Sequence, residues 1–352
     1  MLLMVLLVAI ATAALQVVTG QPILANVLHH LRWWAFCWQF RIFGRDTKKP
    51  KSPPPKIAPT TRKVRIVFVR HGDSEWNALF NRFGLGWPVR FAKFVLNSVR
   101  FWLFCRDDDV LIDAALSAKG VQQAEALAAY ARNPGSAFPR DPATSVVVSS
   151  NLRRAMATAL LGLKPRLADT REKVIIDSTL QEGSNNPDAH SFMTRAYHLS
   201  DSPVLTYATA PALARVFDPV FNGGNKAIDA NVYSRIDTFA RRVMADGSGD
   251  DKPYRCVEPP QSSTDLAGLA TAAAATKPWG QVPTDVIVVG HSLWIRGFFW
   301  RFLPAGTKHP AANKKLQNCA AVECWLYAAP DGTLKVDEAS VKILHSNYVG
   351  VK

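Results

Sequence analysis

The sequence predicts an α/β protein: a three-layer α/β/α domain with a mostly parallel open sheet and helices on both faces, preceded by an N-terminal membrane-anchor helix. Three observations lead to this fold class. Short β-branched runs alternate with segments of helical periodicity from residue 63 onward. Two of these runs end in a histidine, His71 and His291. The residues before Thr19 are almost purely apolar and carry no charge.

The composition is that of an ordinary globular protein. Of the 352 residues, 48% are hydrophobic and 20% are charged, which excludes a disordered, coiled-coil or multi-span membrane protein. This length suits one large domain or two smaller ones. The five cysteines are scattered and form no CxxC pair, so neither a zinc site nor a dense disulfide framework is indicated. Reduced cysteines are the simpler interpretation.

The net charge of +14 comes from two segments. Residues 1–65 carry ten basic side chains against one acid, Asp46, and residues 78–106 carry five basic side chains and no acid. The rest of the chain is neutral. Both basic segments are also rich in aromatic residues. This pattern favours two local anion-binding surfaces over a protein that is basic throughout.

The N-terminal quarter predicts a membrane anchor over residues 1–30 and a tether over 31–62. Met1–Val18 as a helix is about 27 Å long, close to the ~30 Å hydrocarbon core of a bilayer. Trp, Phe and Arg in Leu31–Phe43 suit a membrane–water interface. A cleaved signal peptide and a buried core helix are the alternatives. Because basic residues only follow the apolar run, we expect the rest of the chain in the cytosol. A secreted or organellar location is the alternative.

Residues 63–352 predict the catalytic domain, with insertions at about 78–112 and 246–281. Short apolar runs predict five strands: Val64–Val69, Ser145–Val148, Val174–Ile176, Asp285–Val289 and Cys319–Tyr327, with Val341–His345 as a further candidate. Helical spacing predicts four helices: Ser117–Tyr130, Leu152–Leu161 with Asn151 as its N-cap, Val232–Met244 and Ile295–Phe302. Strands separated by helices favour an open sheet that binds its ligand at the carboxyl ends of the strands.

The two histidines therefore fall on the edge where α/β folds place their sites. A neutral imidazole can attack phosphorus, and the guanidinium of Arg70 beside His71 can hold phosphate oxygens in a bidentate manner. Gly72 lets the backbone turn closely there. Arg154 opens a helix directly after a strand, where its charge and the helix N-terminus both favour an anion.

Four blocks in order resemble the histidine phosphatase superfamily, phosphoglycerate-mutase-like branch. They are VRHGDSEWN from Val69, DAALSAKGVQQA from Asp113, SSNLRRAMAT from Ser149 and VVGHSLWIR from Val288. The blocks and the elements between them cover roughly half of the chain.

The resemblance implies a phosphohistidine mechanism without a metal or an organic cofactor. His71 is the expected nucleophile, and Arg70, Arg154 and His291 are expected to hold the phosphoryl oxygens. Asn77 is a further candidate for phosphate binding. The expected general acid is Glu182, in the Leu-Gln-Glu-Gly stretch after the third predicted strand, with Asp73 and Asp188 in reserve.

Departures from the family pattern narrow the predicted activity. Asp73 stands where Glu or Gln is usual, and Ser292 where Gly is usual. The stretch after Glu182 lacks the glycine and arginine pattern that receives phosphoglycerate in mutases, which favours a phosphomonoester hydrolase. A phosphoglycerate-mutase-type phosphotransferase and an inactive membrane-bound binding module are the alternatives. The substrate can be a phosphorylated small molecule, a lipid or a phosphoprotein.

The basic aromatic segment from Arg82 to Arg106 has two main interpretations, and nucleic-acid binding is a minor third. It can be an amphipathic helix packed on the domain, or an interfacial helix that lies on anionic lipid. An anionic membrane surface is thus an expected partner, and no nucleic acid is expected.

Overall fold

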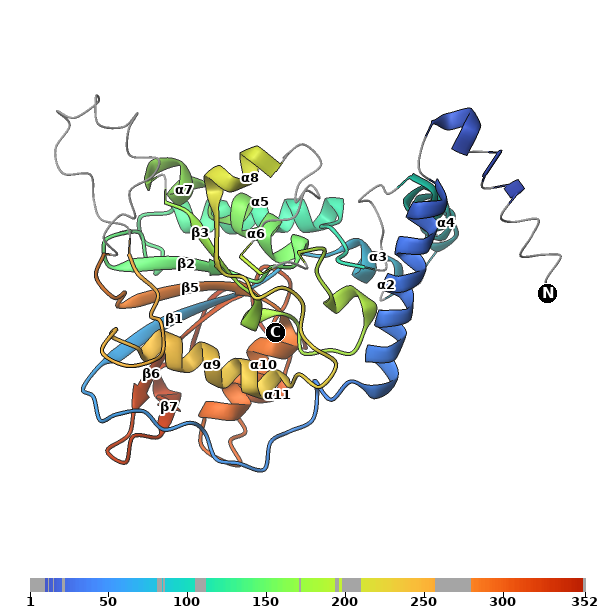
Figure 1. Cartoon of the computed structure of the whole chain (residues 1–352). Coiled ribbons are helices and arrows are strands. Elements are labelled where there is room, and N and C mark those ends of the chain that lie inside the picture. The colour runs from blue at the N-terminus through green and yellow to red at the C-terminus, as the bar shows by residue number, and fades with distance from the viewer. Residues whose placement is uncertain are drawn as a thin grey trace, which may run out of the picture.

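An eight-stranded sheet forms the centre of the molecule (Figure 1). The computed structural model describes residues 10, 11, 13, 14, 16–20, 23–80, 84, 86–104, 112–170, 172–193, 196, 197, 210–256 and 280–350. The strands are β1 (Lys63–Arg70), β2 (Ser145–Ser149), β3 (Val174–Asp177), β4 (Phe217–Phe221), β5 (Asp285–Gly290), β6 (Ala321–Ala328), β7 (Leu334–Val336) and β8 (Lys342–His345).

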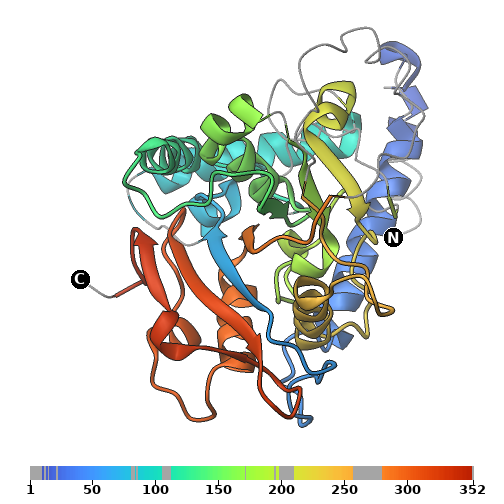
Figure 2. The same ribbon diagram turned by 90° about the vertical axis from the view of Figure 1, so that its left-hand side faces the viewer.

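The sheet is mostly parallel. The strand order is β4-β3-β2-β5-β1-β6-β7, with β8 also paired to β6. The pairs from β4 across to β1 are parallel, and the pairs of β6 with β1, β7 and β8 are antiparallel. Figure 2 shows β6, β7 and β8 at the edge opposite β4. The carboxyl ends of the parallel strands therefore share one edge of the sheet, as the sequence predicts.

Helices cover both faces of the sheet. One face carries α5 (Ala118–Arg132), α6 (Arg153–Gly162), α7 (Lys164–Thr170) and α8 (Ala210–Val216), and the other carries α9 (Val232–Met244), α10 (Ser292–Phe302) and α11 (Pro310–Asn313) (Figure 1). Strand β1 alternates between the two cores: Ile66 and Phe68 pack with α9 and α10, whereas Val67 and Val69 pack with α5 and α6. This alternation is the two-residue period of a strand buried on both sides.

The predicted strands and helices of the domain are present within three residues of their expected ends. Strands β4 and β7 and helices α7, α8 and α11 were not predicted. Strand β4 was not predicted, because its central Pro219 weakens the strand signal; a proline is tolerated there because β4 is an edge strand. Asn151 does not cap α6. The N-cap is Leu152, and Asn151 Nδ2 instead donates to Asn222 Oδ1 (3.0 Å) and to the carbonyl of Gly224 (3.1 Å).

The N-terminal region contains a long helix, α2 (Ile23–Phe43), which contacts α4 (Trp87–Phe104). A short helix, α3 (Glu75–Phe80), precedes α4. Most of Met1–Val18, the apolar part of the predicted anchor at 1–30, lies outside the described residues, as does most of the predicted insertion at 246–281. Among the described residues, no helix combines the length and the apolar character needed to cross a bilayer.

The segment after α2 lies along the catalytic domain rather than away from it. The carbonyl of Ser52 accepts from Arg301 Nη1 (2.7 Å), and the amide of Ile57 donates to the carbonyl of Gly332 (2.9 Å). Arg62 Nη2 donates to the carbonyl of Pro283 (2.7 Å) just before β1 begins. These bonds explain why a Lys- and Pro-rich stretch has one defined path.

Candidate active site

His71 and His291 stand side by side because their strands end together. In the parallel pair of β1 and β5, Arg70 lies opposite Gly290, and the amide of His71 donates to the carbonyl of Gly290 at 2.9 Å. The next residue on each strand is a histidine, and the two ring centroids lie 5.1 Å apart. Both side chains are almost completely buried. The sheet register thus produces the pair that the sequence predicts.

The ring of His71 is held in a neutral state with a fixed orientation. Its Nδ1 lies 2.6 Å from the carbonyl of Gly72, and because a carbonyl only accepts, we assign the ring proton to Nδ1. The lone pair is then on Nε2. Burial, and then the positive charges of Arg154 and Arg70, hold the pKa of His71 well below its usual range. The imidazole therefore stays unprotonated at neutral pH.

The turn after His71 packs very closely on the start of α5. A Cβ on Gly72 would lie 2.6 Å from the carbonyl oxygen of Gly120. Gly120 in turn lies against the backbone of Asp73. The absence of side chains at Gly72 and Gly120 therefore lets the turn and the helix pack this closely. The position of the Gly72 carbonyl, which orients His71, depends on this close packing.

His291 is oriented by a serine that sequence reasoning missed. Its Nε2 lies 2.9 Å from Ser150 Oγ, and Ser150 Oγ accepts the amide of Leu152 (3.4 Å), which leaves the hydroxyl proton for Nε2. We therefore assign the His291 proton to Nδ1, which is buried and has no hydrogen-bond partner in the described structure. Burial, followed by Arg154, holds the pKa of His291 well below its usual range. A neutral ring with an unpartnered N–H can donate to a bound oxyanion.

Two arginines add donor capacity. Arg70, the last residue of β1, donates from Nη1 to the carbonyl of Leu316 (2.6 Å), whereas its buried Nε has no partner among the described residues. Arg154 lies in the first turn of α6 and is 2% exposed. Its Nη1 donates to the carbonyl of Asp188 (2.8 Å), and its Nη2 lies 3.6 Å from Asp188 Oδ2. The unpartnered Nε of Arg70 and the buried guanidinium of Arg154 suit a phosphate.

The start of α6 is capped by a distant carboxylate. Asp113 Oδ1 accepts the amide of Arg153 (2.8 Å), and Asp113 Oδ2 accepts the amide of Phe192 (3.0 Å). Asp113 is the first residue of the second sequence block, so this block supports the helix that carries Arg154. No local pattern around the helix start indicates that partner.

Glu182 has the features of a general acid. Its Oε1 accepts the amides of Gly183 (2.9 Å) and Trp294 (3.2 Å), which leaves Oε2 to carry a proton. Burial, and to a lesser extent the charge of Asp188, raises the pKa of Glu182 above its usual value, against the opposing effect of Arg154. The protonated form therefore persists to higher pH than in an exposed glutamate.

The two reserve carboxylates have different surroundings. Burial also raises the pKa of Asp188, which faces Arg154. Asp73 accepts the hydroxyl of Ser117 at Oδ2 (2.8 Å), so this carboxylate is engaged with the N-cap of α5. Asp188 therefore lies in the site, whereas Asp73 has a structural contact.

A cavity of about 170 Å³ joins these groups. Five of the six predicted side chains line it: Arg70, His71, Asn77, Arg154 and Glu182. The sixth, His291, is buried next to His71. Further lining residues that were not predicted for the site are Ser74, Trp76, Ser184, Asn186, Leu293 and Lys315. Among the described residues, no cluster of three or more His, Cys, Asp or Glu side chains could hold a metal ion.

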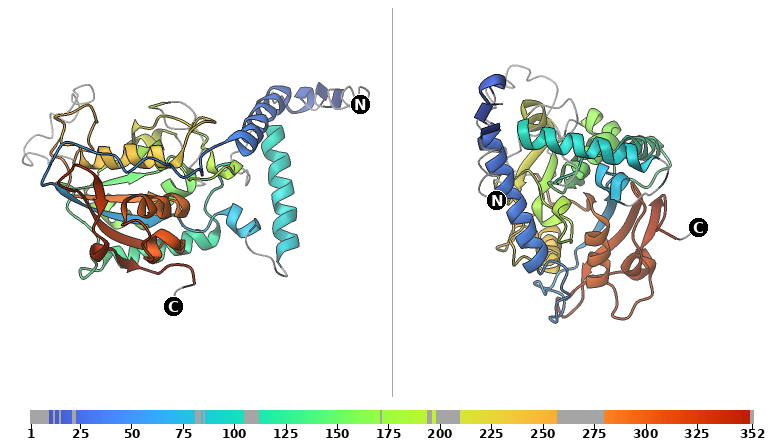
Figure 3. Two further views of the ribbon diagram at one scale, coloured as in Figure 1. Left: turned by 90° about the horizontal axis from the view of Figure 1, so that it is seen from below. Right: turned by 90° about the vertical axis from the view of Figure 1, so that its right-hand side faces the viewer.

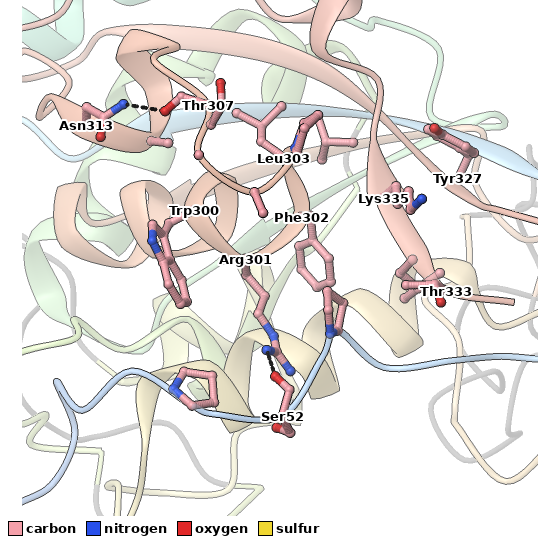
Figure 4. Close-up of a pocket in the computed structure, with 18 residues that line it drawn as sticks. Ser52, Trp300, Arg301, Phe302, Leu303, Thr307, Asn313, Tyr327, Thr333 and Lys335 are labelled. Carbon is pink, nitrogen blue, oxygen red and sulfur yellow. Dashed lines mark hydrogen bonds between the residues drawn. The ribbon is translucent and has the colours of Figure 1, made fainter. Parts of the chain in front are cut away.

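A larger cavity, of about 800 Å³, lies between the 50–54 segment, the end of α10 and strands β6 and β7 (Figure 4). Among the described residues that line it there is no carboxylate, imidazole or thiol. Its one guanidinium, Arg301, donates to the carbonyl of Ser52 (2.7 Å) and to both carboxylate oxygens of Asp237 (2.9 and 2.8 Å). The larger cavity thus does not contain the pair of histidines and the carboxylate that the sequence predicts for the site.

The chain matches no protein-family model and no curated protein. Solved structures with a similar fold include a mycobacterial glucosyl-3-phosphoglycerate phosphatase, at 17% identity and a TM-score of 0.36 over 81% of this chain and 99% of that chain. A putative alpha-ribazole-5'-P phosphatase from Escherichia coli matches at 15% identity and a TM-score of 0.35, over 82% and 99% of the two chains. Phosphoserine phosphatase from Entamoeba histolytica matches at 12% identity and a TM-score of 0.32, over 80% and 96%.

The four sequence blocks meet at one edge of the sheet. They supply His71 with Arg70, the Asp113 cap of α6, Arg154 with Ser150, and His291. The blocks that resemble the histidine phosphatase superfamily in sequence thus come together in one site at the carboxyl edge of the sheet.

Proposed function

We propose that the protein hydrolyses phosphomonoesters through a phosphohistidine intermediate. The observation that carries the proposal is the state of His71: a buried, neutral imidazole whose Nδ1 is bound by Gly72 and whose Nε2 is free, beside two arginines. A neutral imidazole with a free lone pair beside cationic groups is suited to nucleophilic attack on phosphorus.

The reaction has two balanced steps. His71 Nε2 attacks phosphorus, the bond from phosphorus to the ester oxygen breaks, and Glu182 gives its proton to the leaving alkoxide. Glu182, now a carboxylate, then takes a proton from water, whose oxygen attacks the same phosphorus. The phosphorus–nitrogen bond breaks, inorganic phosphate leaves, and both His71 and Glu182 return to their starting states.

The surrounding donors act on the charge that develops in the transition state. Arg70 Nε, Arg154 and His291 Nδ1 are already oriented in a buried site, so their donors need little reorganisation during the reaction. Asn77, on α3, lines the same cavity and can bind the phosphate or the bridging oxygen.

The chain segment that follows Glu182 favours a phosphatase over a mutase. Among its described residues, this segment contributes Ser184, Asn186 and Asp188 to the cavity, and no basic side chain that would bind the carboxylate of a phosphoglycerate. Lys315 is the one further cation among the lining residues and comes from the loop after α11. The mutase and the inactive binding module remain outcomes of the experiment.

The wider setting of the enzyme rests on sequence. We retain as proposals an N-terminal anchor at 1–30, a cytosolic catalytic domain and a phosphorylated small molecule, lipid or phosphoprotein as substrate. No nucleic acid is expected among the partners.

The test is hydrolysis of p-nitrophenyl phosphate by the full chain, with and without a chelator, beside His71→Ala. His345→Ala is the matched control, because His345 is a half-buried histidine on β8 outside the site. We expect chelator-insensitive turnover and an acid-labile, base-stable phosphoenzyme, both lost only in His71→Ala. Phosphoryl exchange between phosphoglycerates without net hydrolysis would support the mutase. A folded protein that forms no phosphoenzyme would support the binding module.

A further inference from the structure

Helix α2 has an apolar face that no part of the described structure covers. Its inner face buries Ile23, Cys37 and Phe40 against the domain. On the opposite side, five large apolar side chains each remain 46–65% exposed: Leu24, Leu28, Leu31, Trp38 and Ile42. Their spacing of four, three, seven and four residues aligns them in one stripe along the helix. The helix is therefore apolar on two opposite faces, and only one of them is buried against the domain.

Helix α4 repeats this arrangement. Five of its apolar side chains are 42–74% exposed: Val89, Phe91, Val95, Leu96 and Val99. The side of α4 that faces the protein packs Phe94 near Phe80, with ring centroids 6.2 Å apart. A second apolar surface thus points away from the domain, on a helix that lies in one of the sequence insertions.

The two helices act as one unit on one side of the molecule. Asn26 Nδ2 on α2 donates to the carbonyl of Leu103 on α4 (3.1 Å). Figure 3 shows both helices on the side toward which the parallel strands point. We call the ten exposed apolar side chains of these two touching helices the α2–α4 face. Large apolar side chains that remain exposed side by side on a helix are typical of an interaction site.

The charge around the α2–α4 face identifies its partner. Neither helix contains an acidic residue, and exposed Arg32, Lys93 and Arg100 border the apolar stripes. Two copies of this face would bring like charges together, which disfavours self-association. Its centre is mainly Leu, Val and Ile, which offer little for stacking of nucleic-acid bases. An apolar centre with a basic border and a Trp34–Trp38 ring contact of 5.6 Å matches an anionic bilayer surface.

We propose that the α2–α4 face docks on the surface of an anionic phospholipid bilayer. Both helices lie in the interfacial plane, with their exposed apolar side chains among the acyl chains and their arginines and lysine at the headgroups. The docking is independent of whether residues 1–22 also insert. It places the active-site edge of the sheet beside the membrane.

The first experiment is a lysine-acylation footprint on the full wild-type chain, read by mass spectrometry. Lys93 on α4 and Lys335 on β7 are both exposed, so each reports on its own surface. The vesicles contain phosphatidylcholine and about 30% phosphatidylserine, so about one lipid in three is charged. With these vesicles we expect slower acylation of Lys93 and no change at Lys335. With phosphatidylcholine alone, protection should be weak. Equal acylation of Lys93 with and without anionic vesicles would overturn the proposal.

The second experiment separates the α2–α4 face from the N-terminal residues. Trp38→Gln and Trp325→Gln are a matched pair, since the two indoles are 48% and 38% exposed and only Trp38 lies on the face. We expect the double variant Trp38→Gln/Leu28→Gln to need at least about tenfold more lipid than wild type for half-maximal protection of Lys93. The loss of each apolar contact weakens binding to the bilayer by up to about tenfold. Trp325→Gln should match wild type. A dimer that dissociates in the double variant would instead assign the face to a second copy, and Lys93 protection by an oligonucleotide would assign it to nucleic acid.

Discussion

The ammonium of Lys226 and the carboxylate of Asp46 form an ion pair with an Nζ–Oδ2 distance of 2.7 Å, and both side chains are fully buried. Lys226 Nζ also donates to the carbonyls of Glu182 (2.7 Å) and Ser184 (2.6 Å). Asp46 is held in addition by two hydrogen bonds from Arg235 (2.7 and 2.9 Å). The segment after α2 is thus joined to the backbone of the loop that carries the proposed general acid.

Replacing Asp46 should destabilise the whole domain. Asp46→Asn leaves two buried cations without their shared counter-charge, and breaking such a pair typically costs about 3–5 kcal/mol of unfolding free energy. Urea unfolding measures the loss. Asp331→Asn is the control, because Asp331 pairs with Lys56 at 3.2 Å with both side chains more than half exposed. Exposed pairs contribute about 0–1 kcal/mol, so equal losses in the two variants would contradict the role given to Asp46.

Glu182→Gln should affect substrates according to their leaving groups. A glutamine cannot protonate an alkoxide, so we expect kcat/KM for an alkyl phosphate to fall by about 10²–10⁴-fold. The rate of phosphoenzyme formation from p-nitrophenyl phosphate should fall far less, because nitrophenolate leaves without a proton. Asp188→Asn, which alters a partner of Arg154, should reduce kcat/KM for both substrates by a similar factor. The reverse pattern would make Asp188 the acid. The wild-type rate on the alkyl ester should also fall as pH rises through the raised pKa of Glu182.

The raised pKa of Glu182 also predicts how stability depends on pH. The folded state holds this proton more tightly than the unfolded chain, so Glu182 reduces the unfolding free energy as pH rises from its unfolded pKa of 4.5 through its folded pKa. Glutamine removes this titration. Glu182→Gln should therefore be more stable than wild type at pH 8, and the difference should shrink toward pH 4. Urea unfolding at both pH values tests this, with Glu125→Gln on the exposed face of α5 as the matched surface variant.

Ser150 is a positioning residue for His291. Ser150→Ala removes the hydroxyl that we assign as donor to Nε2, so the His291 ring loses its fixed tautomer. A net loss of about 1 kcal/mol corresponds to roughly a five- to tenfold fall in kcat. KM should change less, and Ser150→Thr should restore part of kcat. Ser149→Ala is the matched control, since the neighbouring Ser149 hydroxyl donates to the carbonyl of Ser150 (3.0 Å) and does not contact His291. Loss of kcat in both serine variants would indicate a general effect on β2.

Arg154 and its neighbour Arg153 provide a test of phosphate binding at constant charge. Arg154→Lys keeps the charge and loses the planar fork, so the inhibition constant of inorganic phosphate should rise about tenfold or more. Arg153→Lys should leave this constant unchanged, because Arg153 Nε donates to the carbonyl of Asp113 (2.7 Å) and its guanidinium lies 5.1 Å from the ring centroid of Phe192. An equal rise in both variants would mean that charge alone binds the phosphate.

The sequence predicts the parts of the fold that have local signatures. The runs before His71 and His291 mark the strand ends, and the helix from Val232 to Met244 has both of its predicted ends because its apolar period is complete. The positions of Arg70, Arg154 and Glu182 follow from their places at strand or helix ends. Their catalytic roles stay predictions that the variants above test.

Other parts of the site depend on contacts that no local pattern records. Lys226 and Asp46 are 180 residues apart, and neither stands in a recognisable motif. The cap of α6 comes from Asp113, forty residues upstream, instead of Asn151. Ser150 could be recognised only once the register of β2 and β5 brings it to His291, with its amide bound to the carbonyl of Val289 (3.0 Å). The division of the chain into anchor, tether and catalytic domain stays a prediction.

The attachment of residues 44–62 to the domain has a kinetic consequence. A domain on a free linker takes many heights and orientations above a membrane. Here the linker is bound to the domain at four residues, so the domain keeps one height and one orientation relative to α2. These residues are Asp46, Ser52, Ile57 and Arg62. With the α2–α4 face docked, the enzyme meets a lipid-borne substrate by lateral diffusion. The rate then follows the number of substrate molecules per unit area of bilayer, and diluting the substrate lipid with inert lipid slows turnover at constant bulk concentration.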